Sequence, residues 1–213
     1  MARQPSLVYQ RLKAYDDQLR EQYGEIVVGC DEVGRGAVAG PMCSAAVILP
    51  VGVELQGLND SKKLEEKKRE ELYEVIMRSA LAVSVAWSSV EEIDSKGITY
   101  ANQHTMEQAC AEVQGMMPCR VSVYVVDQAP RFPFSPCIMI PKADGTSQAV
   151  AAASIVAKVT RDRFMTALAE EHPGYGLATN KGYLNNGHME GLLKNGRVVN
   201  LHRISFHIKG IDK

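Results

Sequence analysis

The chain has 213 residues and a net charge of −1, with 46% hydrophobic and 23% charged residues, values that are ordinary for one soluble globular domain. The near-neutral charge argues against a protein that coats nucleic acid nonspecifically. No apolar run reaches the roughly 18 residues of a membrane span, and the first residues lack the apolar core of a signal peptide. We therefore expect a single domain over residues 1–213 that is cytoplasmic and has no membrane partner.

The first part of the chain alternates helix and strand patterns. Residues 1–23 place apolar side chains at loose helical spacing. Two apolar, β-prone runs follow at 26–30 and 42–49, joined by a glycine-rich turn. Capping residues at 59–61 predict the start of a charged helix that extends over about 64–80.

The middle of the chain continues this alternation. A strand is predicted at 82–87, and a capping-box pattern at 89–92 begins a helix that a longer one follows at 98–113. The apolar run 121–126 predicts a buried strand, and after a proline-rich loop residues 137–140 predict a short one.

The last long element is an alanine-rich helix at 146–171, which ends before the His-Pro-Gly sequence at 172–174. Strands that alternate with helices in this way indicate an α/β fold. We expect a central mixed β-sheet flanked by helices.

Acidic residues stand where predicted strands end. Asp31 and Glu32 follow the strand at 26–30, Asp127 follows the strand at 121–126, and Asp144 precedes the alanine-rich helix. Functional strand ends of α/β sheets gather at one edge, so these four carboxylates can converge. The cysteines and histidines show no metal-binding spacing, and oxygen ligands alone suit Mg²⁺ or Mn²⁺. Taken singly, each acid could equally be a helix cap or a surface charge.

The segment Gly34-Arg35-Gly36 comes directly after the first two acids. Glycines let backbone amides approach a ligand closely, and an arginine offers a planar set of donors for phosphate oxygens. These features indicate a phosphate-binding turn beside a metal site. The alternative is an ordinary acidic turn with an exposed salt bridge.

Five sequence blocks, in order along the chain, resemble bacterial ribonuclease HII. The blocks are D-E-V-G-R-G at 31–36 with A-G-P at 39–41, L-N-D-S-K-K-L at 58–64, A-A-A-S-I-V-A-K-V-T-R-D at 151–162, K-G-Y at 181–183 and H-R-I-S-F at 202–206. The match extends from about residue 24 to about residue 207. Five ordered blocks are far more specific than any one of them.

The resemblance implies a ribonuclease H-like fold with a small helical C-terminal extension, at about 172–213, that contributes to nucleic-acid binding. It implies a type 2 ribonuclease H that hydrolyses the RNA strand of RNA–DNA hybrids. It further implies cutting on the 5′ side of single ribonucleotides embedded in duplex DNA, leaving 5′-phosphate and 3′-hydroxyl ends, in ribonucleotide removal during DNA repair and replication. The implied cofactor is Mn²⁺ or Mg²⁺, and the expected state is a monomer that binds nucleic acid.

The resemblance also assigns residues by position. Asp31, Glu32, Asp127 and Asp144 match the family's catalytic, metal-binding acids. The matched substrate-binding residues are Gly34, Arg35 and Gly36, which sense the ribose 2′-hydroxyl, Tyr183, which packs against the neighbouring deoxyribose, and Lys62, Ser154 and Lys181. Without the resemblance, a half-buried structural tyrosine is the more common role for Tyr183.

Other roles remain open for two of these residues. Lys62 follows a capping sequence and can contact phosphate or stay solvated. Ser154 shares a helix face with Lys158 that can meet a nucleic-acid backbone or pack on the sheet. Gln128 and Ala143 stand where the family usually has glycine, which narrows the backbone conformations beside Asp127 and Asp144.

Two further hypotheses fit the acidic residues. One is another divalent-metal nuclease of the same fold, such as a DNA junction resolvase, which needs no 2′-hydroxyl sensor. The other is a hybrid-binding module whose acids hold a structural cation. Cleavage of an all-DNA duplex favours the first, and binding without turnover favours the second.

Overall fold

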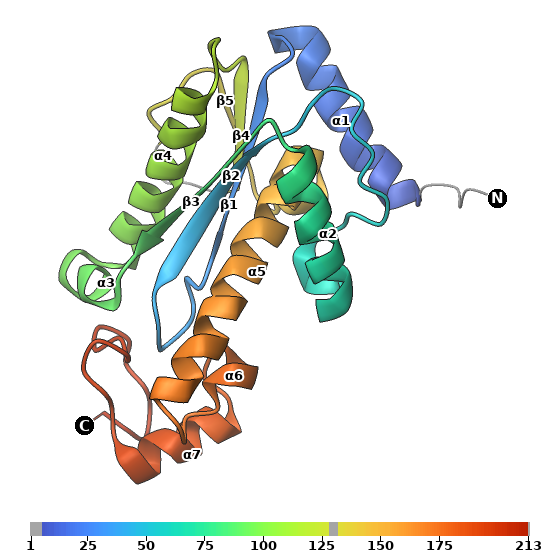
Figure 1. Ribbon diagram of the computed structural model, residues 1–213. Coiled ribbons are helices and arrows are strands. Elements are labelled where there is room, and N and C mark those ends of the chain that lie inside the picture. The colour runs from blue at the N-terminus through green and yellow to red at the C-terminus, as the bar shows by residue number, and fades with distance from the viewer. Residues whose placement is uncertain (1–5, 128–131, 213) are drawn as a thin grey trace.

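A five-stranded sheet in the order β3-β2-β1-β4-β5 forms the centre of the protein (Figure 1). The computed structural model describes residues 6–127 and 132–212. The strands are β1 (Val27–Val33), β2 (Met42–Ile48), β3 (Ala82–Ser88), β4 (Val123–Asp127) and β5 (Cys137–Ile140). Neighbours among β1, β2 and β3 are antiparallel, whereas β4 runs parallel to β1 and β5 parallel to β4. The predicted mixed sheet is confirmed.

Helices cover both faces of this sheet. They are α1 (Leu7–Tyr23), α2 (Glu66–Ser79), α3 (Val90–Lys96), α4 (Ile98–Met116), α5 (Gln148–Glu171), α6 (Leu177–Asn180) and α7 (Asn186–Asn195), with 3-10 turns η1 (Ser61–Lys63) and η2 (Ala143–Gly145). Helices α1, α2 and α5 lie on one face and α4 on the other (Figure 1). None of the helices within residues 6–127 and 132–212 combines the length and apolar character needed to cross a membrane.

The alternation of side chains along β2 explains the two layers. Cys43, Ala45 and Val47 pack with α1, α2 and α5, while Ala46 and Ile48 pack with α4. Successive residues of a strand point to opposite faces, so an uninterrupted apolar run such as β2 is buried on both sides.

Helix α5 lies unusually close to β1. A Cβ atom at Gly29 would come within 2.1 Å of the carbonyl carbon of Ala149, and Ala151, Ala152 and Ala153 are fully buried. Small residues on both elements permit this approach. As a result, the first half of α5 lies beside the end of β1 that carries the acids.

Several element boundaries differ from the prediction. Strand β4 ends at Asp127, so Asp127 lies in the strand rather than after it. Strand β1 continues to Val33, because Glu32 and Val33 still pair with β2; Asp31 and Glu32 therefore lie inside the strand rather than after it. The capping residue Asp60 serves η1, accepting from the backbone N–H of Lys62, and α2 begins only at Glu66. Gln128 and part of the proline-rich loop lie outside the described residues.

The segment after α5 packs against the foot of that helix (Figure 1). Tyr175, Leu177, Leu192 and Leu201 form an apolar cluster with Met165 of α5 and with Val38 and Ala39 of the glycine-rich turn. This contact brings the C-terminal segment next to the chain that leaves β1.

Candidate active site

Three carboxylates meet at one edge of the sheet. The parallel pairing of β1 and β4 sets Cys30 opposite Val126, so the next residues along, Asp31 and Asp127, are neighbours. Asp31, Glu32 and Asp127 each offer an oxygen, and these oxygens lie within 4.8 Å of one another. Such a group can hold a divalent cation.

Asp144 lies near these three residues but outside the 4.8 Å group. It sits in the turn η2, and its side chain is buried. Burial, and next the negative charge of Asp60, raise the pKa of Asp144. Its Oδ2 atom has no hydrogen-bond partner among the described residues. A buried polar atom of this kind is expected to bind a cation or a water.

Crowding of negative charge perturbs the acids strongly. Burial raises the pKa of Asp31 well above its ordinary value, and repulsion from Glu32, Asp144 and Asp127 acts in the same direction, against a hydrogen bond from Ser154. Burial also raises the pKa of Glu32, helped by the charge of Asp127. A bound cation would relieve both effects. The oxygen-only donor set and the unpartnered Asp144 oxygen therefore fit a divalent metal.

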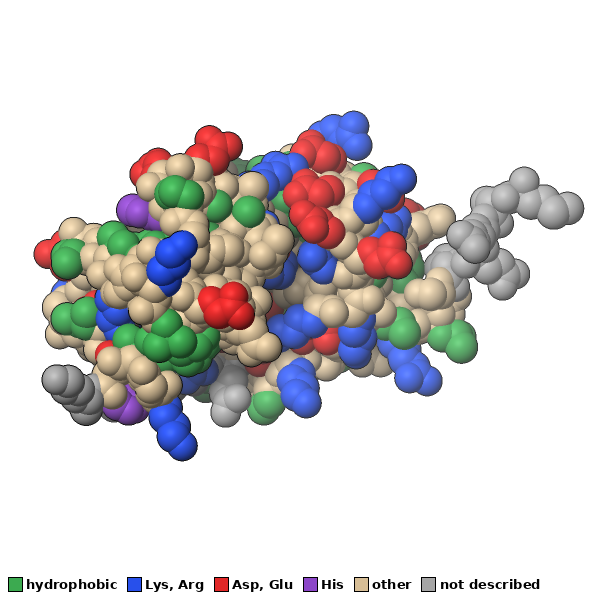
Figure 2. Space-filling model, turned by 90° about the horizontal axis from the view of Figure 1, so that it is seen from below, with side chains coloured by type: hydrophobic (Ala, Val, Ile, Leu, Met, Phe, Trp, Pro, Cys, Tyr) green, Lys and Arg blue, Asp and Glu red, His purple; other side chains and the backbone are tan. Residues whose placement is uncertain are grey.

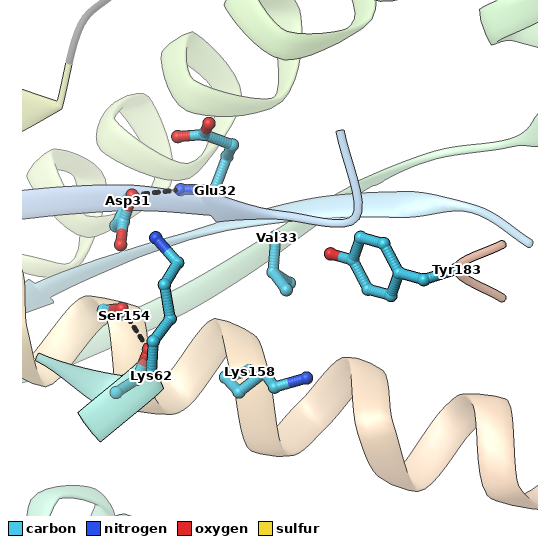
Figure 3. A pocket seen from close by; sticks show the side chains of 8 residues that line it. Asp31, Glu32, Val33, Lys62, Ser154, Lys158 and Tyr183 are labelled. Carbon is cyan, nitrogen blue, oxygen red and sulfur yellow. Dashed lines mark hydrogen bonds between the residues drawn. The ribbon is translucent and has the colours of Figure 1, made fainter. Parts of the chain in front are cut away.

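A pocket of about 280 Å³ extends from these acids along β1 and α5 (Figure 3). Its walls are Asp31, Glu32 and Val33 from β1, Ser61 and Lys62 from η1, Ser154 and Lys158 from α5, and Tyr183 from the C-terminal segment. The acids lie at one end and Tyr183 at the other, with Val33 between them (Figure 3). Segments far apart in the sequence thus build one continuous wall.

Lys62 extends its amine toward the acids (Figure 3). Burial acts to lower the pKa of Lys62, but the charges of Asp144 and Asp31 outweigh burial and raise it. The amine is therefore protonated at neutral pH and balances part of the negative charge. The backbone N–H of Lys62 donates to Asp60 over 2.9 Å, which fixes the start of the side chain.

The α5 wall is both a packing surface and a lining. Ser154 Oγ and Ser61 Oγ share a hydrogen bond of 2.8 Å. One turn further along, the amine of Lys158 pairs with Asp162 over 2.8 Å. Ala151, Ala152, Ala153 and Ala157 of the same helix pack in the core against the sheet. The helix therefore has a packing face and a face that lines the pocket.

The glycine-rich segment leaves β1 directly after Val33. Gly34 is buried with φ 91, whereas Arg35 and Gly36 are exposed. No atom of the described chain lies within 4 Å of the position that a Cβ would take at Gly36. The backbone there is open to a ligand, and the charge of Arg35 acts to lower the pKa of Glu32.

Tyr183 and Lys181 lie in one short turn but face different places. Tyr183 is 36% exposed, and its ring closes the pocket. The Lys181 amine points away from it and donates to Thr166 Oγ1 and to the carbonyl oxygen of Ala178. The pocket therefore includes Lys62, Ser154 and Tyr183 but excludes the side chain of Lys181.

Several residues at the site escaped sequence-based reasoning. Asp60 was assigned a capping role, with no indication that it also lies beside Asp144. Two fully buried arginines, Arg161 and Arg203, hold the glycine-rich turn from behind. Both belong to the resembling blocks, but local sequence gives no sign that an arginine is buried.

Figure 2 shows the end of the molecule that carries the C-terminal segment. Lys and Arg side chains border the hollow in the middle of this face, and acidic side chains gather beside it over α2. A polyanion that enters the hollow would meet the basic side chains first.

The family model and the relatives that match this sequence carry the same description, Ribonuclease HII. The sequence model of the family Ribonuclease HII matches residues 28–209. Ribonuclease HII of Alkaliphilus metalliredigens is 44% identical over 193 residues, which cover 90% of this chain and 94% of that protein. Ribonuclease HII of Geotalea daltonii is 41% identical over 207 residues, with 94% of each chain covered.

Solved structures agree with the fold. A chain of the PCNA:RNase HII complex from Archaeoglobus fulgidus superposes with a TM-score of 0.67 at 27% identity, covering 86% of this chain and 96% of that one. Ribonuclease H2 from Pyrococcus horikoshii OT3 gives 0.65 at 25% identity, covering 85% and 93%. Bst-RNase HIII in complex with Mn²⁺ gives 0.72 at 18% identity, covering 96% and 71%, a likeness of fold alone.

The expected ribonuclease H-like fold is thus confirmed, and the match to the family model spans most of the chain. The chain belongs to the ribonuclease HII family and is a type 2 ribonuclease H, an endonuclease that acts on RNA–DNA hybrids.

Proposed function

We propose that the enzyme also cuts duplex DNA on the 5′ side of a single embedded ribonucleotide. The products are a 3′-hydroxyl end upstream and a 5′-phosphate on the ribonucleotide downstream. One observation carries this proposal: a single pocket joins the acids to Tyr183, and the glycine-rich segment leaves β1 from its wall at Val33. Two consecutive sugars can be read along such a wall.

Discrimination between the two sugars follows from their chemistry. A ribose 2′-hydroxyl is both a donor and an acceptor, and the open backbone at Gly34, Arg35 and Gly36 can approach it without steric obstruction. The Tyr183 ring can pack against the next sugar when that sugar lacks a 2′ oxygen. The pair would recognise an RNA-to-DNA step rather than a base sequence.

Asp31, Glu32, Asp127 and Asp144 would hold the divalent cations, either Mn²⁺ or Mg²⁺. When bound there, the cations lower the pKa of the attacking water and stabilise the departing 3′ oxygen. The unpartnered Oδ2 of Asp144 and the raised pKa of Asp31 support this assignment, because both describe carboxylates whose negative charge is not fully balanced within the protein. The polarity of the cut follows, since the leaving group is a 3′ oxygen.

The basic residues of the pocket would hold the phosphates. Lys62 lies against the acids and can approach the scissile phosphate, while Lys158, which lines the wall toward Tyr183, would have to exchange its pairing with Asp162 for a phosphate. Because the Lys181 amine is already hydrogen-bonded within the protein, Lys181 would contribute through its backbone, which leads directly to Tyr183.

The segment from about 172 to 213 would take part in nucleic-acid binding as a part of the one domain, since it supplies Tyr183. The proposed active form is a monomer. A nick beside an embedded ribonucleotide would begin its removal during DNA repair and replication.

Cleavage of three end-labelled duplexes tests the proposal. One carries a single ribonucleotide, one is an RNA–DNA hybrid and one is all DNA, each with Mg²⁺, with Mn²⁺ or with a chelator. We expect metal-dependent cutting of the first two, and in the first a single cut 5′ of the ribonucleotide. An intact single-ribonucleotide duplex would refute the proposal, and cutting of the all-DNA duplex would point to a resolvase-type nuclease.

A further inference from the structure

Arg161 is a fully buried side chain in the middle of α5 whose guanidinium group lies behind the pocket. It donates from Nε to the carbonyl oxygen of Pro41 over 2.8 Å and from Nη2 to that of Ala39 over 3.3 Å. From Nη1 it donates to the carbonyl oxygen of Lys181 over 2.9 Å. One planar group thus binds Ala39 and Pro41, at the end of the glycine-rich turn that begins at Gly34, and Lys181, in the turn that carries Tyr183.

The acceptors are main-chain carbonyl oxygens, whose partial charges neutralise a cation less completely than a carboxylate does. Burying a guanidinium on such partners is costly unless the hydrogen-bond geometry is good. Arginine has a rigid fork of donors that fixes the relative positions of its acceptors, a geometry that a lysine amine cannot reproduce. The side chain therefore acts as a spacer between two backbone segments.

Close packing shows that this spacing leaves little freedom. The carbonyl oxygen of Gly182 accepts from the backbone N–H groups of Val38 and Ala39, over 2.9 and 3.1 Å. A Cβ atom at Gly182 would come within 2.2 Å of the Ala39 carbonyl oxygen. A Cβ atom at Gly34 would come within 2.3 Å of Arg161 Nε. Gly182 thus packs against the Ala39 carbonyl group that Arg161 binds, and Gly34 packs against Arg161 itself.

We propose that Arg161 is a positioning residue for substrate choice, which sets the separation between the Gly34–Gly36 backbone and the Tyr183 ring. The inference rests on the proposed reading of two consecutive sugars by these elements. A change in their separation harms recognition of an RNA-to-DNA step, where both must engage at once. It harms a long hybrid less, because a hybrid needs only the glycine-rich segment.

Arg203 supplies a matched comparison. It is also fully buried and also donates to carbonyl oxygens, but both acceptors lie in the glycine-rich turn: Gly40, at 3.0 and 2.8 Å, and Arg35, at 3.1 Å. Arg203 therefore holds one of the two sugar-reading elements, whereas Arg161 joins both. The same substitution at the two positions therefore distinguishes loss of the separation between the two elements from loss of support for one of them.

The experiment compares Arg161→Lys with Arg203→Lys on a single-ribonucleotide duplex and on a long hybrid. Arg163→Lys, on the exposed side of the same helix, is the surface control. For Arg161→Lys we expect kcat/KM to fall about 100-fold on the single-ribonucleotide duplex and about 10-fold or less on the hybrid, the scale of loss for misplaced substrate groups. Arg203→Lys should lower kcat/KM on both substrates by a similar factor. In a Tyr183→Ala background, Arg161→Lys should change the ratio of the two substrates no further.

Equal losses on both substrates for a folded Arg161→Lys protein, or a ratio that matches that of Arg203→Lys, would overturn the proposal. If the wild type fails to cut the single-ribonucleotide duplex, the proposed function is wrong, whatever the variants do. If Arg161→Lys does not fold, Arg161→Gln is compared with Arg203→Gln on the same two substrates. Equal losses on both substrates for Arg161→Gln contradict the proposed spacer.

Discussion

Asp127 Oδ1 accepts a hydrogen bond of 2.8 Å from the backbone N–H of Lys142. Lys142 has φ 59, a left-handed conformation that is uncommon for a residue with a side chain. Two residues further on, the chain presents Asp144. The carboxylate at the end of β4 therefore anchors the turn that carries another acid of the site.

Two substitutions at Asp127 distinguish the effect of its negative charge from the effect of its hydrogen bond to Lys142. Asp127→Asn keeps an oxygen that can accept from Lys142 but removes the negative charge, so hydrolysis should fall more than about 100-fold while the protein stays folded. Asp127→Ala should lose activity to a similar degree and also about 1 kcal/mol of stability, because the anchoring hydrogen bond is gone. Cleavage assays and urea unfolding without metal measure the two effects. Near wild-type activity of Asp127→Asn in saturating Mn²⁺ would remove this residue from the catalytic set.

Asp144→Asn should cause a smaller loss than Asp127→Asn. Asp144 lies outside the group of three acids whose oxygens approach within 4.8 Å, and Mn²⁺ accepts looser coordination than Mg²⁺. We expect weak activity in Mg²⁺ that rises toward the wild-type value as Mn²⁺ is titrated in. Complete inactivity in both metals would place Asp144 on a par with Asp31.

The metal-free protein should lose stability as pH rises. The folded-state pKa of Asp31 is raised, so the folded state holds this proton more tightly than the unfolded chain does. The resulting stabilisation is present below the unfolded pKa, about 3.8, and is lost as pH rises through the folded-state value. In chelator, the free energy of unfolding of Asp31→Asn should therefore rise relative to that of the wild type as pH increases from about 4 to 7.

Added Mg²⁺ or Mn²⁺ should reverse this difference. A cation at 100 times its dissociation constant stabilises the wild type by about 2.7 kcal/mol, and Asp31→Asn should gain less. Thermal unfolding with and without chelator measures both parts. A pH-independent difference between the two proteins in chelator would show that Asp31 carries no raised pKa.

Gly34 and Gly36 should respond differently to a side chain. Gly34 has φ 91 and packs against Arg161, so Gly34→Ala should destabilise the protein by more than about 1 kcal/mol. Gly36 faces open space, so Gly36→Val should leave stability within about 0.5 kcal/mol. Activity of Gly36→Val should still fall on both substrates, because the branched side chain would displace the sugar. Full activity with a normal melting temperature would exclude Gly36 from sugar contact.

The convergence of Asp31 with Asp127 was predictable, because the functional strand ends of α/β sheets gather at one edge. The length of β1 was not, since Asp31 and Glu32 are charged and stay in the strand through pairing with β2. The place of Asp60 beside Asp144 and the burial of Arg161 depend on contacts between distant segments. Propensity and periodicity describe only local chain, so they carry no record of such contacts.

The substrate-binding residues show the same division. Residue type and family pattern pointed to the Lys181-Gly182-Tyr183 block, but the directions of its two long side chains are set by packing. Lys181 has φ 53, and its amine turns back to Thr166 while the Tyr183 ring enters the pocket. A sequence can place such a turn near the site without telling which of its side chains faces the substrate.

Tyr183→Ala should lower cleavage at a lone ribonucleotide more than cleavage of a long hybrid. The ring would pack against the deoxyribose, a contact that only the RNA-to-DNA step would use. We expect the loss to be about 5- to 150-fold, the scale of an aromatic contact with a nucleotide. The backbone at this position is held independently, because His188 Nδ1 lies 3.1 Å from the Tyr183 carbonyl oxygen and the Tyr183 N–H donates to Asn180. Removal of the ring should therefore leave the turn in place.

Tyr183→Phe is the matched control, since it keeps the ring and removes only the hydroxyl group. It should retain the preference of the wild type, and the ratio of kcat/KM on the two substrates is the quantity to measure. If Tyr183→Ala lowers both substrates equally, the tyrosine supports the fold and reads no sugar. If Tyr183→Phe loses the preference as Tyr183→Ala does, the hydroxyl rather than the ring makes the decisive contact.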